Sequence, residues 1–103
     1  MKWQYSDGWQ LDDFAASISI EDDYALGAEE KRPFVAFTCS AASKSIVLGL
    51  NPGDTMIVTN IGGTNAVTIK AITGDTGTSV AAGKTALCIG SGTANASKIL
   101  VLN

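Results

Sequence analysis

Apolar and polar residues alternate in short runs along most of the chain. Val67 and Ile69 lie two positions apart and would share one face of a strand. Thr68 and Lys70 would share the opposite, polar face, as a half-buried strand requires. Short runs rich in Val, Ile, Thr, Leu and Phe predict six strands, at residues 34–39, 44–50, 55–60, 65–72, 84–89 and 98–102.

Turn-forming residues separate these runs. Proline presets φ for the first central position of a turn, and glycine takes a positive φ without steric cost. Such residues cluster at 51–54, 62–65, 74–77, 82–83 and 90–92. Residues 34–103 have no sustained helical periodicity. Short strands separated at regular intervals by turns predict an all-β fold, a small antiparallel β-sandwich or barrel.

The first thirty residues differ in charge from the rest of the chain. They carry eight acidic side chains and one base, for a net charge of −7, whereas residues 31–103 carry a net charge of +4. Five of the seven aromatic residues also lie in this first part. The break predicts an acidic, aromatic N-terminal arm at residues 1–33 and a compact β module at residues 34–103.

The arm has the composition of a segment that docks on protein. Residues 10–14 predict the start of a short helix capped by Asp7, and residues 17–20 alternate like a strand. The aromatic side chains provide apolar area whose burial contributes roughly 25 cal/mol per Å². Docking on the chain's own module and docking on a neighbouring protein both remain open. The candidate partner-binding residues are Trp3, Tyr5, Trp9, Asp12, Asp13, Phe14 and Tyr24.

Residues 34–103 are poor in charge. They contain only six charged side chains, about nine per cent, where roughly a quarter is usual in soluble domains. A small free monomer uses charge to stay soluble and to protect its sheet edges. We therefore expect self-association into a closed symmetric oligomer. The alternative is that threonine and serine hydroxyls keep the surface sufficiently hydrated.

Three stretches resemble the β modules of tailed-bacteriophage virion proteins. They are residues 45–60 (SIVLGLNPGDTMIVTN), 63–69 (GTNAVTI) and 73–85 (TGDTGTSVAAGKT). The resemblance is to head fibres and capsid decoration proteins, and it covers residues 44–103. It implies a structural virion protein, made in the host cytoplasm, that forms a homotrimer. The arm would then anchor it to the major capsid protein or another virion protein.

A carbohydrate- or host-receptor-binding module is the alternative function. Trp3, Tyr5 and Trp9 could form an aromatic platform for a sugar ring of a host surface glycan, with Asp7 accepting hydrogen bonds from its hydroxyls. The same tryptophans would instead be buried anchors if the arm docks on protein. A response of tryptophan fluorescence to soluble sugars separates the two hypotheses.

The sequence provides no residue set for catalysis. It contains no histidine, the usual general base at neutral pH and the commonest metal ligand. The adjacent carboxylates of Asp12–Asp13 and of Asp22–Asp23 point in different directions, so neither pair forms an acid/base dyad. Clustered carboxylates leave weak calcium binding as an alternative, although their spacing matches no EF-hand. We predict no enzymatic activity and no cofactor or metal.

Other functional classes are also disfavoured. Residues 78–85 (TSVAAGKT) lack the first glycine of a phosphate-binding loop and its parallel βα context, so we predict a hairpin turn there. Scattered bases, and aromatics placed among acids, argue against nucleic-acid binding. The chain has no run of about twenty apolar residues, so we expect no membrane span. Cys39 and Cys88 lie in apolar runs and are predicted to be buried thiols, a single disulfide being the alternative.

Overall fold

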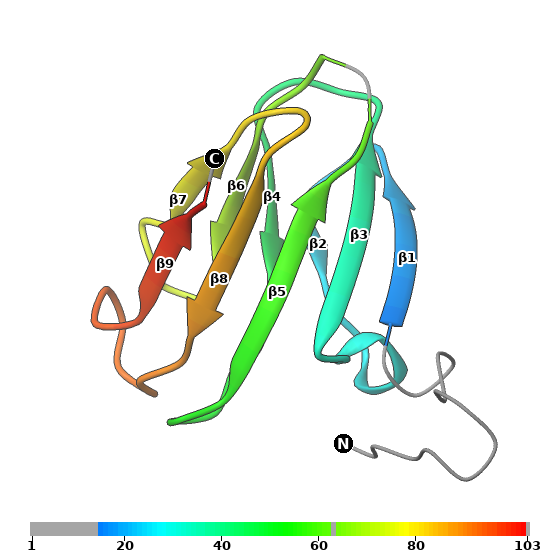
Figure 1. Cartoon of the computed structure of the whole chain (residues 1–103). Coiled ribbons are helices and arrows are strands. Elements are labelled where there is room, and N and C mark those ends of the chain that lie inside the picture. Colours follow the sequence, from blue (N-terminus) through cyan, green and yellow to red (C-terminus); the bar gives the residue numbers. More distant parts are fainter. Residues whose placement is uncertain (1–14, 63, 103) are drawn as a thin grey trace, which may run out of the picture.

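Two β-sheets face one another in the computed structural model, which describes residues 15–62 and 64–102 (Figure 1). The five-stranded sheet has the order β1-β3-β5-β8-β9 and the four-stranded sheet the order β2-β4-β6-β7. The strands of the first are β1 (Ala15–Ile20), β3 (Phe34–Cys39), β5 (Thr55–Asn60), β8 (Thr85–Ile89) and β9 (Lys98–Val101). The strands of the second are β2 (Tyr24–Ala25), β4 (Lys44–Val47), β6 (Val67–Lys70) and β7 (Thr78–Val80). A single-turn 3₁₀ helix, η1, spans Ala28–Glu30.

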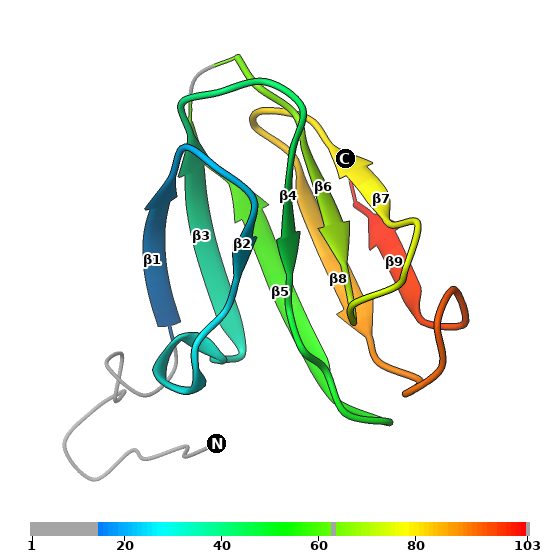
Figure 2. The ribbon, with the colours of Figure 1, turned by 180° about the vertical axis from the view of Figure 1, so that it is seen from behind.

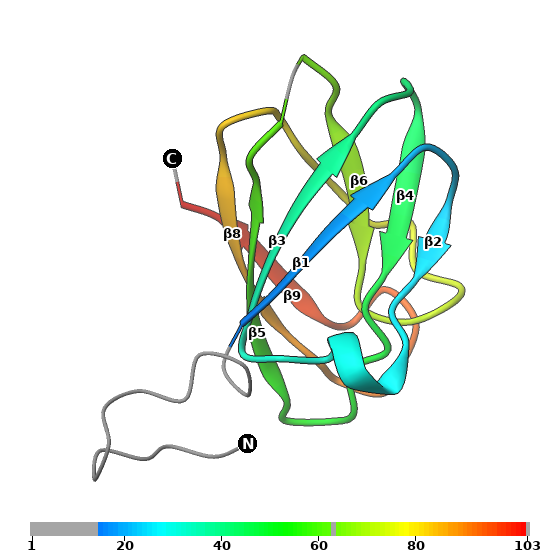
Figure 3. The same ribbon diagram turned by 90° about the vertical axis from the view of Figure 1, so that its right-hand side faces the viewer.

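The predicted all-β sandwich is confirmed, but the prediction of antiparallel sheets is wrong and no closed barrel forms. The first six strands alternate between the sheets, so β1, β3 and β5 run parallel, as do β2, β4 and β6. Among the described strands, the pairs β5–β8, β8–β9 and β6–β7 are the antiparallel ones. The chain between two neighbouring parallel strands of one sheet passes through a strand of the other sheet. A connection between parallel strands has to leave its own sheet in this way. Figure 2 shows the molecule from behind, with the four-stranded sheet nearer the viewer, and Figure 3 shows the two layers from the side.

Most predicted strands and turns occur where the alternation placed them. The bounds 34–39 and 55–60 are those of β3 and β5, and β4, β6, β8 and β9 are shorter than expected. Gly53 and Gly83 have φ of 84° and 83°, as the turn chemistry predicts.

The hairpin predicted within residues 78–85 is wrong. Strand β7 occupies the first three of these positions and belongs to the four-stranded sheet, whereas β8 belongs to the other. The turn between them, closed by the Lys84 N–H donating to the Ala81 carbonyl at 3.0 Å, therefore connects the two layers.

Residues 15–33, assigned from sequence to the arm, form part of the sandwich. Strand β1 contains the predicted strand-like residues 17–20 and pairs in parallel with the whole of β3. Strand β2 pairs with β4 in the other sheet. The predicted helix start at 10–14 lies outside the described residues.

Alternate residues of the facing strands fill the space between the sheets. Phe37 on β3, Ile46 on β4 and Ile69 on β6 are fully buried. Val67 is also fully buried and Thr68 half-buried, as the alternation predicted. In the part of the chain that the structure describes, no helix is long and apolar enough to cross a bilayer.

Cys39 and Cys88 are free thiols buried in this core, which confirms the predicted packing role. Burial raises the pKa of the Cys88 thiol to about 12 because the thiolate would lose its hydration. The thiol therefore stays protonated at neutral pH and packs as a small apolar group.

A buried asparagine connects the layers at one end of the sandwich. The Asn60 Nδ2, on β5 of the five-stranded sheet, donates to the carbonyls of Asn65 at 2.9 Å and Val80 at 3.0 Å. Asn65 Nδ2 in turn donates to the Cys39 carbonyl at 2.9 Å. These amides give the buried backbone carbonyls of both layers hydrogen-bond partners that water cannot supply there.

A buried aspartate joins two loops. Asp75 Oδ2 accepts hydrogen bonds from the N–H groups of Ala71, at 3.0 Å, and Ile72, at 3.2 Å. Its Oδ1 accepts from the Asn95 N–H at 2.6 Å, in the loop between β8 and β9. The loop between β6 and β7 is thereby fixed to a loop of the other sheet.

We expect Asp75→Ala to lower the free energy of unfolding by about 2–4 kcal/mol, because three N–H groups lose a charged acceptor. Urea unfolding followed by far-ultraviolet circular dichroism measures this change. Asp54→Ala is the control, since the Asp54 carboxylate accepts from the single exposed N–H of Asn51. Equal losses in the two variants would contradict the role assigned to Asp75.

Candidate interaction surface

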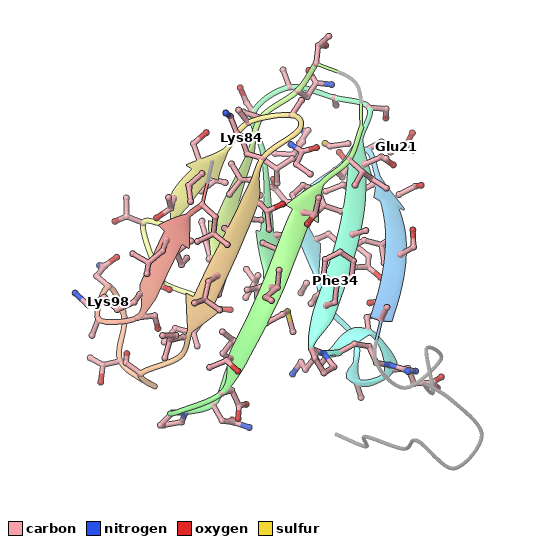
Figure 4. All side chains as sticks on the ribbon, viewed as in Figure 1. Glu21, Phe34, Lys84 and Lys98 are labelled. Atoms are coloured by element: carbon pink, nitrogen blue, oxygen red, sulfur yellow. The ribbon has the colours of Figure 1, made fainter. Side chains whose placement is uncertain are left out.

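One row of apolar side chains crosses the outer face of the five-stranded sheet. The strand register aligns Ala15 with Phe34, Phe34 with Ile57, Ile57 with Leu87, and Leu87 with Leu100. We call these five residues the apolar row. Successive side chains of a strand point to opposite faces, and the strand neighbours Val35, Val58 and Ala86 are buried in the core. The row therefore faces away from the core. Figure 4 labels Phe34, its member on β3.

The apolar row is accessible to a partner. Ile57 is 37% exposed and Leu100 is 53% exposed, while Phe34 and Leu87 are half-buried by their neighbours in the sheet. The outer face of a sheet in a sandwich is usually polar because it contacts water. A contiguous apolar strip at this position is typical of a surface that contacts another protein.

Hydroxyl groups border the apolar row. The hydroxyls of Thr59 and Thr85 lie 3.1 Å apart on neighbouring strands, and Thr38 donates to Ser19 at 3.1 Å. Among the residues of the five strands, Lys98 is the one charged side chain, at the start of β9. A partner can therefore cover this face without removing many charges from water, which would be unfavourable.

The outer face of the four-stranded sheet has a different chemistry. Ser45, Thr68 and Ser79 align across it as a row of hydroxyls. The adjacent row contains Val47 and Lys70. The low charge of the chain is thus accompanied by a strip of large apolar side chains on one face only.

Tyr24 is the one predicted partner-binding residue of the arm that the structure describes. It lies on β2, packs against the core, and its hydroxyl donates to the Glu30 carboxylate, 2.7 Å from Oε1 and 2.6 Å from Oε2. This hydrogen bond raises the pKa of Tyr24, and burial and the negative charge of Glu30 act in the same direction. The contact fixes η1 against β2. The other candidates, Trp3, Tyr5, Trp9, Asp12, Asp13 and Phe14, lie outside the described residues.

The acidic pair Asp22–Asp23 binds the start of β4. Asp23 Oδ1 accepts hydrogen bonds from the Ser45 N–H at 2.9 Å and from its hydroxyl at 3.3 Å. Asp22 lies 3.6 Å from the Lys44 ammonium in an exposed ion pair, which contributes little to stability. The two carboxylates therefore contact the four-stranded sheet at neighbouring positions.

Hollows on the surface are shallow. One of about 370 Å³ is lined by Lys31, Arg32 and Asp54 among others, and another of about 500 Å³ lies beside Ser19 and Cys39. The first brings charged groups of both signs together, and the second has Glu21 as its one charged lining residue. Within the described residues, the apolar row is the surface feature best suited to contact with another protein.

Sequence reasoning identified the shortage of charge but not the apolar row. Its members are separated along the chain by other strands and become neighbours only through the register of the sheet. The available signal was the outward apolar residue in each strand, such as Ile57 between the buried Met56 and Val58. Comparison with protein-family models, with curated proteins and with solved structures finds no match for this chain.

We expect the stability of the protein to fall above pH 10, partly through Tyr24. Its pKa is raised in the folded state, so the unfolded chain releases this proton first. The contribution of Tyr24 to the free energy of unfolding is complete below its pKa in the unfolded chain. It is lost as the pH rises through the pKa of Tyr24 in the folded protein. Thermal unfolding of the wild type and Tyr24→Phe between pH 8 and 11.5 measures it.

The difference in Tm between wild type and Tyr24→Phe should be constant up to about pH 9.5 and should narrow at higher pH. Cys88 is present in both proteins and contributes equally to both curves. A difference that stayed constant up to pH 11.5 would show that the Tyr24–Glu30 contact does not affect the titration.

Proposed function

We propose that the chain is a structural accessory protein of a tailed-bacteriophage virion, a capsid decoration or head-fibre module. It assembles with copies of itself and attaches to the particle. The observation that supports this proposal is the apolar row on a nearly uncharged sheet face. Such a face is suited to burial against another protein rather than to chemistry on a small molecule.

The sandwich prepares this face for binding. The members of the apolar row are held at fixed spacing by paired strands, whose inner faces are packed in the core. A partner therefore gains apolar burial without first ordering a loop, which would reduce the affinity. Burial of this face would also remove apolar surface from water in a module that has few charged residues to keep it in solution.

Residues 1–14, the part of the predicted arm that precedes the sandwich, provide the proposed attachment to the particle. Residues 1–14 lead into β1 at Ala15, so the segment joins the sandwich at one end of the apolar row. Aromatic anchors in pockets supply most of the binding energy of typical interfaces, and charges at the rim contribute orientation. Trp3 and Trp9 would fill pockets on the major capsid protein or another virion protein, while Asp12 and Asp13 would meet basic residues there. The resemblance of residues 44–103 to phage modules supports this setting and implies three copies.

Glycan binding is the competing proposal for the same aromatic residues. It requires Trp3, Tyr5 and Trp9 to accept a sugar rather than a protein pocket. Titration of the full chain with a broad panel of soluble glycans, followed by tryptophan fluorescence, tests it directly. A saturable change with one class of sugar supports the receptor-binding function, and an unchanged spectrum across the panel contradicts it.

We expect Trp3→Ala with Trp9→Ala to reduce particle binding at least a hundredfold, since removal of two aromatic anchors typically costs about 3 kcal/mol or more. Binding is measured by cosedimentation of purified protein with particles that lack it. The control variant, Trp3→Phe with Trp9→Phe, keeps aromatic area in both positions and should retain most of the affinity. If the double alanine variant bound particles with wild-type affinity, this result would contradict the proposed anchoring role of the arm.

A further inference from the structure

Strand β9 leaves an apolar edge on the five-stranded sheet. Of the four strands at sheet edges, β2 has two residues and β7 has three, and edges this short offer little for another strand to pair with. Strand β1 is polar at Ser17 and Ser19 on its outer face. Strand β9 has four residues, and three of them are Ile99, Leu100 and Val101.

The side chains on and after β9 are open to a partner. Leu100 is 53% exposed, Val101 42% and Leu102 57%, which makes this the most exposed group of large apolar residues in the part of the chain that the structure describes. Natural edge strands are normally protected by charges, prolines or bulges. Lys98 is the only such residue on β9.

The backbone groups of β9 divide between the two sides of the strand. The Leu102 N–H donates to the Thr85 carbonyl at 2.7 Å, which makes these residues a hydrogen-bonded pair of the β8–β9 ladder. Such pairs alternate with non-hydrogen-bonded pairs in an antiparallel ladder. Leu100 therefore also bonds to β8, while the N–H and C=O groups of Ile99 and Val101 point away from the sheet. Among the strands that the structure describes, none pairs with this outer side of β9.

We propose that β9 pairs antiparallel with β9 of a second copy of the chain, about a two-fold axis that passes beside Leu100. This register places Ile99 of one copy opposite Val101 of the other, and each such pair exchanges two backbone hydrogen bonds. The two five-stranded sheets then form one continuous sheet across the axis. The inference rests on the self-assembly in the proposed function and assigns its surface, with two copies at this contact in place of the three that the phage resemblance implies.

The register is self-complementary in its side chains as well. Leu100 lies opposite its own counterpart as a non-hydrogen-bonded pair, in which side chains approach most closely. Because Leu100 ends the apolar row, the row of one copy continues directly into the row of the second copy, through Leu87 and Ile57 on either side. Lys98 lies opposite Leu102 of the other copy, so the two ammonium groups lie at opposite ends of the contact and do not repel one another. These features favour a second copy over an unrelated strand.

A charge-exchange experiment at Leu100 tests the two-fold contact. Leu100→Lys and Leu100→Glu each place like charges directly opposite one another, so each variant alone should have the mass of one chain, 10.6 kDa. An equimolar mixture places lysine opposite glutamate and should recover an assembly of two chains. Light scattering over a hundredfold range of concentration measures these masses. The full-length wild type, measured first, should have the mass of two chains.

Two further variants separate pairing from folding. Val101→Pro removes an N–H that points out of the sheet and leaves the hydrogen bonds to β8 intact, so it should weaken dimerisation at least tenfold with an unchanged circular dichroism spectrum. Ser79→Lys adds the same charge as Leu100→Lys to the exposed outer face of the edge strand β7. It should keep the mass of the wild type.

The outcomes distinguish this inference from the proposed function. Dimers of the wild type and of the mixture, with monomers of each single Leu100 variant, support the β9 contact. An assembly of three chains, or any assembly that Leu100→Lys and Val101→Pro leave intact, overturns the β9 contact and keeps self-assembly. A wild type that remains monomeric at all concentrations overturns both the contact and the self-assembly part of the proposed function.

Discussion

The structure depends on the packing of two sheets through side chains that alternate along each strand. Each of the first five strands is followed by a strand in the opposite layer, so neither layer can form without the other. Phe37 and Met56 from one sheet and Ile46 and Ile69 from the other fill the interior. Because the parallel pairs and the pair β5–β8 join strands that lie far apart in the chain, their ladder hydrogen bonds form only when this interior is assembled. The core therefore determines the surface as well, because each inward residue fixes the outward direction of its neighbours.

Buried polar groups complete the connection between the layers where apolar packing ends. Asn60 donates to the Val80 carbonyl across the sandwich, and Asp75 accepts from Asn95 in a loop of the other sheet. At the half-buried edge of the four-stranded sheet, the Tyr24 hydroxyl and the Glu30 carboxylate hold the helix η1 against β2. The amide and carboxylate provide hydrogen-bond partners for backbone groups of the loops, which keeps the loops in defined positions. The two outer faces can therefore differ in chemistry without any change in the frame that carries them.

The outer faces of the two sheets differ in chemistry, so the two sides of the module are not equivalent as binding surfaces. One face presents hydroxyls and Lys70, and the other presents the apolar row that ends at Leu100 on an unprotected edge strand. The exposed β9 edge favours association side by side within one extended sheet, which joins the two apolar rows on its outer face. The arm enters at the opposite end of the row, beside Ala15. Self-association and attachment are thus proposed for opposite edges of the same sheet, where they do not compete for the same residues.

The sequence by itself determined the all-β class, the strands β3 and β5 with their bounds, the turn at Gly53, and the burial of Cys39 and Cys88. These features follow from the two-residue period of a strand and from the backbone preferences of glycine and proline, which act within a few residues. The tertiary structure decided that β1, β3 and β5 are parallel, that β7 is a strand, and that Ile57 lies between Phe34 and Leu87. Alternation is the same whichever way a strand runs and whichever strand lies beside it. Direction and neighbours are therefore fixed only by contacts between segments distant in the chain.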